Sequence, residues 1–479
     1  MLRTPHALSV IVPALLGIAV SQEAAPQTIP RLRVSDNHRY LVTENGGRFF
    51  YLADTAWELL HRLNREDVSR YLDDRKAKGF TVFQTVALAE FDGVRVPNAY
   101  GHLPLANADP SKPLTKDGPD NDFWDHVDHT IREANKRGIY VALLPTWGDK
   151  WNRKWGKGPE IFTPENAAAY GRWLGARYRN DGIIWVLGGD RPIENDRHRD
   201  IIRAMATGLR EGDGGAHLIT FHPTGARGSA ENFHQEPWLD FNMRQNGHSP
   251  DFSRYAKTRD DYRRAPIKPV VDGEPIYEDH PVDFKGDELG TSVAADVRLA
   301  LYWDLLGGAF GHTYGNHAVW QMYVPGKSEP INRPVLPWPQ ALNQPGAVQM
   351  HHGIDLLKAR NSENLIPDDS LIVRSNDDPT VPGAGRYRIV AARDEAGAFA
   401  LVYTPVGRMF SLDLRSLRCD RLNCAWYDPR TGKSTRIGSF ENRAPVAFTP
   451  PSPGEFQDWV LIADNAGKAM PLPGESTQK

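Results

Sequence analysis

Two carboxylates in this sequence stand where acid–base and nucleophilic chemistry would need them. Asp190 follows the apolar run IIWVLGG, and Glu274 follows PVVDG and precedes Pro275. The glycine before each carboxylate lets the backbone approach a ligand closely. Cleavage of a glycosidic bond needs such a pair, because one protonated acid serves the leaving oxygen and one ionised carboxylate serves the anomeric carbon.

Each carboxylate also has a structural interpretation, and the sequence leaves both open. Asp190 stands before Arg191-Pro192 and could cap a helix that begins with proline. Glu274 could be a solvated loop residue. Both follow predicted strands, and carboxylates at strand ends are enriched for function in α/β barrels.

The segments that position these carboxylates alternate between strand-like and helix-like patterns, which indicates an α/β fold with parallel strands. Eight strands are predicted, the fifth and sixth being short: Phe49–Ala53, Thr81–Leu88, Tyr140–Leu144, Ile183–Leu187, Leu218–Phe221, Phe241–Met243, Pro269–Val271 and Phe310–Tyr314. Six helices follow from apolar spacings of three and four: Arg65–Lys78, Phe123–Arg137, Ala167–Arg179, Arg197–Glu211, Tyr255–Arg264 and Ser292–Leu306. Eight units over about 250 residues predict a (β/α)8 TIM barrel. An open doubly wound sheet would normally show a Gly-rich first turn, and none occurs.

In a barrel, Asp190 and Glu274 end the fourth and seventh strands, on opposite sides of the mouth, so their carboxylates can flank one bond. Other polar and aromatic residues also fall at strand ends and are expected to bind substrate in a small, shallow pocket for one terminal sugar: Asp54, Trp57, Trp147, His222, Gln245, His317 and Trp320. Alternatives remain, since Asp54 could cap the segment DTAWELL and tryptophans pack in cores as readily as they stack on sugars. Glu90 and Asp149 are weaker candidates.

Composition and missing motifs exclude several classes of function. The chain has 479 residues, with 40% hydrophobic and 24% charged residues, and a formal net charge of -3. No basic field is available for nucleic acid or an anionic membrane, and the oligomeric state is not predicted. HExxH, GxSxG, EF-hand and phosphate-loop motifs are absent, and the histidines lack metal-ligand spacing. His351-His352 sits in a helical pattern, which favours a surface or interdomain role. We expect neither a metal nor an organic cofactor.

The N-terminus resembles a secretory signal peptide at residues 1–21. Arg3 precedes the apolar run Ala7–Val20, and Ala19 with Ser21 fits a small-x-small cleavage site. A membrane anchor is the alternative, but the run is interrupted by Pro13 and is shorter than the about 20 residues of a typical span. We therefore expect a periplasmic or secreted protein. In an oxidising compartment Cys419 and Cys424 could form a small disulfide.

A second, smaller domain is expected after the barrel, which we place at residues 31–360. Helical periodicity fades from about Glu363, and short alternating runs predict a small antiparallel β-sandwich over residues 363–479. The runs are Ser370–Val373, Arg386–Ala391, Phe399–Tyr403 and Trp459–Ile462. A helical segment at Gln349–Arg360 would form the bridge onto which it packs.

Long motifs in the chain resemble a known family. Four motifs stand out: RFFYLADTAWELLHRLNREDVSRYLDDRKAKGFTVFQTVALAEF at 48–91, IIWVLGGDRP, PVVDGEP and GHTYGNHAVWQ. Together they resemble the apiosidase-like catalytic domain of glycoside hydrolase family 140. The segment with NLIPDDSLI at 364–372 is similar to a domain called a collagen-binding domain of a collagenase. Nothing in the chain resembles a protease, so the collagen label carries little weight here.

The resemblance implies a retaining, exo-acting glycosidase that removes apiose from pectin side chains. It assigns the acid/base role to Asp190, in the W-x-x-G-G-D motif, and the nucleophile role to Glu274, in the G-E-P motif. As a retaining pair, the two carboxyl groups are expected about 5 to 5.5 Å apart. The alternative from another class is a noncatalytic secreted protein that binds carbohydrate or matrix on a barrel scaffold. Such a protein would need no paired carboxylates at the mouth.

Overall fold

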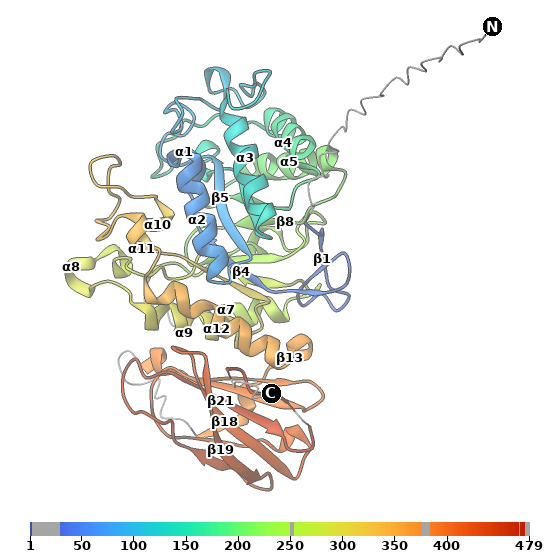
Figure 1. Cartoon of the computed structure of the whole chain (residues 1–479), viewed down its shortest axis with the longest axis vertical. Helices are drawn as coiled ribbons and strands as arrows, with labels where there is room; N and C mark the ends of the chain where they lie inside the picture. Colours follow the sequence, from blue (N-terminus) through green and yellow to red (C-terminus); the bar gives the residue numbers. More distant parts are fainter. Residues whose placement is uncertain (2–28, 250–252, 375–383, 469, 475–479) are drawn as a thin grey trace.

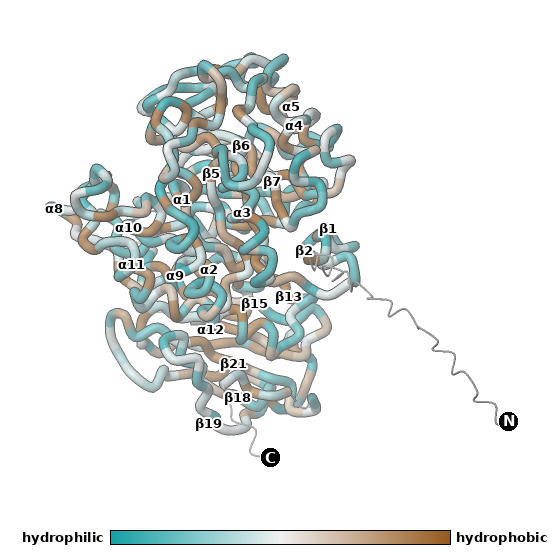
Figure 2. The backbone as a smooth tube through the Cα atoms, turned by 45° about the horizontal axis from the view of Figure 1, so that its top comes forward, coloured by the Kyte–Doolittle hydropathy of each residue, from teal (hydrophilic) through white to brown (hydrophobic). Residues whose placement is uncertain are grey.

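The structure is a computed structural model that describes residues 1, 29–249, 253–374, 384–468 and 470–474. The predicted signal peptide, Met1 apart, lies outside the described residues. An α/β part and a smaller all-β part lie one above the other, with helices between them (Figure 1). Hydrophobic segments run mainly through the interior of both parts, and hydrophilic segments lie mostly at the periphery (Figure 2). Within the described residues, no helix is long and apolar enough to cross a membrane.

Eight parallel strands form a nearly closed barrel, as predicted. They are β4 (Tyr51–Thr55), β5 (Val82–Leu88), β6 (Tyr140–Thr146), β7 (Ile183–Gly188), β8 (Ile219–His222), β10 (Asn242–Gln245), β11 (Val270–Asp272) and β12 (Gly311–Tyr314). Their order is β8-β7-β6-β5-β4-β12-β11-β10, and the short β9 (Arg227–Gly228) pairs antiparallel with β10. The strands β8 and β10 contact each other across the remaining gap. The short fifth and sixth strands that the sequence predicted are therefore present in the barrel.

Each predicted barrel helix is present. They are α2 (Arg65–Ala77), α3 (Phe123–Lys136), α4 (Pro164–Tyr178), α5 (Asp196–Asp213), α7 (Arg254–Arg263) and α9 (Ala294–Gly307). Local sequence explains their starts, since Asn64 caps α2 and Asp122 forms a capping box with Asp125 at α3. Five short helices were not predicted: α1 (Leu59–Arg62), α6 (Ala230–Phe233), α8 (Gly286–Leu289), α10 (His317–Trp320) and α11 (Trp338–Ala341).

A small antiparallel sheet that the sequence did not predict packs against the end of the barrel where the strands begin. It consists of β1 (Leu32–Val34), β2 (Leu41–Thr43) and β3 (Arg48–Phe49). The first predicted strand, Phe49–Ala53, is thus divided between β3 and β4. The Phe49 ring packs edge-on against Tyr140 at the start of β6, with centroids 5.0 Å apart. This contact seals the barrel on the side away from the strand ends that carry the candidate site.

The C-terminal part is a β-sandwich, as predicted. Six strands form one antiparallel sheet in the order β13 (Leu365–Pro367), β15 (Val390–Asp394), β16 (Phe399–Thr404), β21 (Trp459–Asn465), β18 (Arg421–Asp428) and β19 (Lys433–Glu441). The second sheet contains β14 (Ile372–Arg374), β17 (Phe410–Leu412) and β20 (Val446–Phe448). The apolar faces of both sheets form one buried cluster between them. The sequence pattern missed five of these strands, namely β13, β17, β18, β19 and β20. In β19 most side chains are exposed and polar.

Two helices join the barrel to the sandwich. The expected bridging helix is α12 (Pro345–Ala359), and together with α9 it lies between the two parts (Figure 1). Tyr302 of α9 stacks on Tyr403 of β16 with ring centroids 4.9 Å apart. Arg298 of α9 makes two hydrogen bonds to the buried Asp458 carboxylate, of 2.9 and 2.7 Å. The junction is therefore a packed and ion-paired interface.

The disulfide that the spacing of Cys419 and Cys424 allowed is not present. Both residues are free thiols. Cys424 is buried on β18 within the apolar cluster between the two sheets. The Cys419 sulfur instead lies 3.9 Å from the side-chain nitrogen of Asn442. Cys424 therefore contributes to the packing of the sandwich core.

Candidate active site

A cavity of about 730 Å³ opens where the barrel strands end. The lining includes the two carboxylates singled out in the sequence, Asp190 and Glu274, and a third, Glu90. Several expected substrate-binding residues line it as well, namely Trp57, Trp147, Gln245 and Trp320. The fourth and seventh strands of the barrel thus deliver their carboxylates to one cavity.

Asp190 stands on a tight turn that ordinary residues could not form. Gly188, Gly189 and Asp190 all have positive φ, of 96°, 103° and 49°. A Cβ on Gly189 would lie 2.7 Å from the backbone nitrogen of Gly148, and one on Gly188 would overlap the carbonyl oxygen of His222. The two glycines therefore permit close contact with the neighbouring strand ends, and the turn holds Asp190 in a backbone conformation that non-glycine residues rarely adopt.

The surroundings of Asp190 favour its protonated form. Burial and the negative charge of Glu274 raise the pKa of Asp190 to about 6, although Arg191, His222 and a hydrogen bond with Gln245 act in the opposite direction. The Asp190 side chain is still 23% exposed, toward the cavity. A carboxyl group that has a pKa near 6 and faces a ligand cavity can hold a proton and release it.

Glu274 is braced by neighbouring strands. Gln84 reaches from β5 and donates to the carbonyl oxygen of Gly273 at 2.7 Å. The Glu274 amide contacts the Asp272 carboxylate at 3.2 Å, and its carbonyl oxygen accepts from Gly247 at 2.9 Å. These contacts fix the backbone on both sides of the carboxylate. Sequence analysis missed Gln84, although a glutamine inside an otherwise apolar strand was an available signal.

Two imidazoles hold the Glu274 carboxylate in its ionised form. His248 Nε2 lies 3.1 Å from Oε1, and His222 Nε2 lies 3.1 Å from Oε2. Burial alone would raise the pKa of Glu274, but the two histidines outweigh it and lower the pKa to about 2. The cavity therefore contains one carboxyl group that keeps its proton up to about pH 6 and one that is already ionised well below that pH, the difference that acid–base and nucleophilic chemistry requires.

Aromatic rings surround the carboxylates. Trp57 and Trp147 lie with ring centroids 5.1 Å apart, and each is within 6 Å of the His222 ring. On another side, Phe91 lies 5.8 Å from Trp320. Flat apolar rings beside hydrogen-bonding groups suit the faces and hydroxyls of a sugar.

Three of the expected substrate-binding residues do not line the cavity. Asp54 is completely buried, and its Oδ2 accepts from Tyr71 at 2.6 Å and from Arg75 at 2.7 Å, both on α2. Its carboxylate thus joins a strand to a helix, which corrects the expectation. His222 lies behind the lining and contacts Glu274. His317 is buried behind Trp320 and accepts from its indole nitrogen at 3.3 Å.

Sequence reasoning missed His248, Tyr277 and Phe284, which also line the cavity. His248 follows β10 by three residues in the run QNGH, so its place near a strand end was the available signal. Glu90 lines the cavity, whereas Asp149 is completely buried and bound to Lys150 at 2.6 Å. Among the described residues, the three that could hold a metal ion are His351, His352 and Asp355, on α12 and outside the cavity.

Comparison with known proteins identifies the family. The model of the apiosidase-like catalytic domain matches residues 35–363. The chain belongs to this apiosidase-like family. The model of the putative collagen-binding domain of a collagenase matches residues 366–464, the sandwich. A comparison with curated proteins found no match.

Two similar solved structures are described as glycoside hydrolases. A protein described as a glycoside hydrolase is 32% identical over 93% of this chain and 99% of its own, with a TM-score of 0.82. A glycoside hydrolase family 5 protein from Bacteroides vulgatus ATCC 8482 is 33% identical over 91% of this chain and 94% of its own, with a TM-score of 0.83. This apiosidase-like protein is therefore a glycosidase, and its substrate is a carbohydrate.

Proposed function

We propose that this glycosidase is a retaining, exo-acting enzyme that removes a terminal apiose-type sugar from pectin side chains. Glu274 is the nucleophile and Asp190 the acid/base in this proposal. The observation that carries it is the pair of opposite environments in one cavity, where the pKa of Asp190 is raised to about 6 and that of Glu274 lowered to about 2.

The reaction proceeds in two displacements. Glu274 attacks the anomeric carbon and forms a glycosyl ester while Asp190 gives its proton to the departing oxygen. Asp190, now ionised, then takes a proton from water, the water oxygen attacks the anomeric carbon, and the Glu274 carboxylate is released. The free sugar leaves with its original anomeric configuration, and both carboxyl groups return to their starting protonation states.

The surroundings of the cavity support a short substrate segment. Tryptophan rings line the space around the carboxylates, and a second, similarly open cavity shares Phe91, Lys157 and Ile331 with it. We assign the tryptophan-lined space to the terminal sugar and the second cavity to the rest of the polysaccharide, which is the leaving group. Export to the periplasm or the medium is part of the proposal, and the apolar N-terminal run in the sequence supports it.

A panel of nitrophenyl glycosides and pectic oligosaccharides tests the proposal. Release of apiose as the only monosaccharide, with the first-formed anomer retained in a proton NMR time course, is the expected result. Inversion of the anomer would contradict the roles assigned here. Binding of an oligosaccharide by calorimetry without release of any sugar would favour the noncatalytic binding protein.

A further inference from the structure

One tryptophan of the cavity lining is exposed. Trp155 lies in the loop between β6 and α4, and 62% of its surface is accessible. Trp57 and Trp147 of the same lining are buried. An indole ring offers a large flat apolar face, which a ligand in the cavity can cover. Trp155 therefore has a contact surface that the protein itself does not use.

A buried cation holds one face of the Trp155 ring. The guanidinium carbon of Arg191 lies over the ring, 4.5 Å from its centroid, which is a cation–π contact. Arg191 is completely buried, and its Nη2 donates to Glu90 Oε1 at 2.8 Å. Its Nη1 donates to the carbonyl oxygen of Asp190 at 2.8 Å. Because these bonds fix the guanidinium beneath the ring, the accessible area belongs to the other face and the edges of Trp155.

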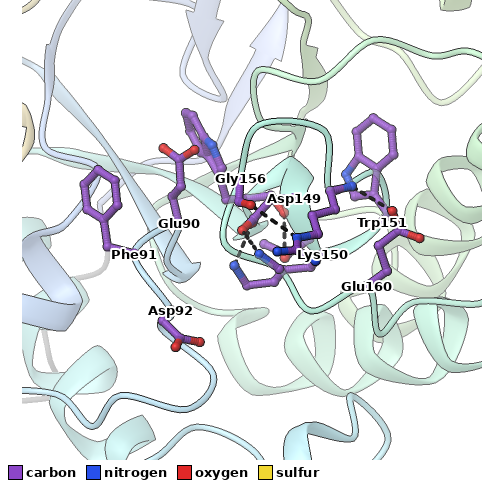
Figure 3. A network of polar contacts seen from close by, with 12 residues as sticks. Glu90, Phe91, Asp92, Asp149, Lys150, Trp151, Gly156 and Glu160 are labelled. Atoms are coloured by element: carbon purple, nitrogen blue, oxygen red, sulfur yellow. Dashed lines mark hydrogen bonds and ion pairs between the residues drawn. The ribbon is translucent and has the colours of Figure 1, made fainter. Parts of the chain in front are cut away.

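The loop that carries Trp155 is anchored to the barrel. The Asp149 carboxylate pairs with Lys150 at 2.6 Å (Figure 3) and accepts from the Gly158 amide at 2.7 Å. A Cβ on Gly156 would overlap the Asp149 Cβ and lie 2.6 Å from Arg191 Nη2. Glycine at position 156 thus lets the loop pass close to both side chains. These contacts keep Trp155 beside the arginine that its ring covers.

Trp155 adjoins the acid/base of the proposed reaction. The arginine beneath its ring lies 3.3 Å from Oδ2 of Asp190, the residue that protonates the leaving oxygen. Two residues after Trp155, Lys157 lines both the cavity and the second cavity, and so does Phe91. The second cavity is the one assigned to the rest of the polysaccharide. The ring therefore stands near the junction of the two cavities, on the side of the leaving group.

We propose that the open face of Trp155 stacks on the first sugar residue of the leaving group. A sugar ring packs its C–H face on the indole and keeps its hydroxyl groups in water. The inference rests on the proposed function, because it needs a carbohydrate attached to the leaving oxygen. It adds a second subsite to the one for the terminal sugar. Binding energy from that subsite lowers the barrier for oligosaccharides and is lost with a simple alkyl glycoside.

The experiment compares two substrates with the same terminal sugar. One is methyl apioside, whose leaving group has no ring, and the other is a pectic oligosaccharide with a terminal apiose. The quantity measured is the ratio of kcat/KM on the oligosaccharide to kcat/KM on methyl apioside. Both leaving groups need protonation by Asp190, so an indirect effect on this acid cancels in the ratio.

Trp155→Ala should lower this ratio about tenfold, the loss expected when a ligand no longer covers one face of an indole. Trp155→Phe should retain most of the ratio, because a smaller flat ring remains. Phe456→Ala is the matched control. Phe456 is also exposed beside an arginine, with its centroid 5.9 Å from the Arg386 guanidinium carbon, but it lies in the sandwich and outside the cavity lining. An unchanged ratio in Trp155→Ala, or an equal fall in Phe456→Ala, overturns the inference.

Binding to Glu274→Gln separates this inference from the proposed function. Calorimetry titrates the pectic oligosaccharide into Glu274→Gln and into the double variant that also carries Trp155→Ala. An affinity about tenfold weaker in the double variant supports the stacking role, even if the wild type does not hydrolyse methyl apioside. That failure would overturn the proposed sugar alone. Equal affinity of the two variants, or no binding by either, overturns the role of Trp155.

Discussion

The backbone amide of Asp190 donates a hydrogen bond to Nδ1 of His222, at 3.3 Å. Nδ1 is therefore the acceptor nitrogen, so the ring N–H that His222 can offer is the one on Nε2. That nitrogen lies 3.1 Å from Glu274 Oε2. The turn that positions Asp190 therefore also orients the His222 imidazole, which contacts Glu274 across the barrel mouth.

His248→Phe is expected to raise the pKa of Glu274. The variant removes one of the two imidazoles that keep this pKa near 2. A hydrogen bond to a charged group is worth about 1.5–3 kcal/mol, which corresponds to roughly one to two pKa units. Because the nucleophile must be ionised, the acid limb of kcat/KM moves to higher pH. His280→Phe is the control, since His280 stacks on His248 without a contact to Glu274, and a similar shift there would refute the assignment.

Replacement of the two carboxyl groups should separate their roles. Glu274→Gln abolishes turnover of every glycoside, because the nucleophile is needed whatever the leaving group. Asp190→Asn reduces kcat/KM on an alkyl glycoside by about 10²–10⁴-fold and on a nitrophenyl glycoside by much less. Azide restores turnover of Asp190→Ala on the nitrophenyl glycoside by attacking the glycosyl ester, and a glycosyl azide accumulates. Full activity of Asp190→Ala on oligosaccharide would make Glu90, the third carboxylate in the cavity lining, the next candidate.

Gly189→Ala should destabilise the protein and inactivate it. Alanine at φ 103° is strained, and its Cβ would lie 2.7 Å from the Gly148 nitrogen. Left-handed backbone alone costs a non-glycine residue about 1–2 kcal/mol. Urea unfolding measures the loss. Gly225→Ala is the matched control on the cavity rim, where nothing lies within 4 Å of the new Cβ. Equal stability of both variants would show that the turn tolerates a side chain.

Asp458→Ala should weaken the junction between barrel and sandwich. It leaves the buried Arg298 guanidinium without its carboxylate, and breaking such a pair costs about 3–5 kcal/mol. Glu455→Ala removes a partner from the exposed pair with Arg386 and should cost less than about 1 kcal/mol. Urea unfolding followed by tryptophan fluorescence compares the two. A cost below 1 kcal/mol for Asp458→Ala would mean that the ion pair does not hold the interface.

Asp54 and Gln84 show where sequence reasoning was limited. Asp54 ends a strand as a ligand-binding residue would, yet it faces α2, because alternate side chains of a barrel strand point to opposite sides. Gln84 lies in the middle of an apolar strand, and only closure of the barrel brings it to Gly273. Which way each side chain faces depends on strand register.

The sequence by itself determined the eight strands, the main helices and the placement of Asp190 and Glu274 at strand ends. These features follow from local periodicity, capping residues and glycine turns, which act over short stretches of chain. The tertiary structure alone decided that Gln84, His222, His248 and Arg191 meet these carboxylates. Their positions are distant along the chain, and the protonation states of Asp190 and Glu274 arise from burial and from charges that only the closed barrel brings together.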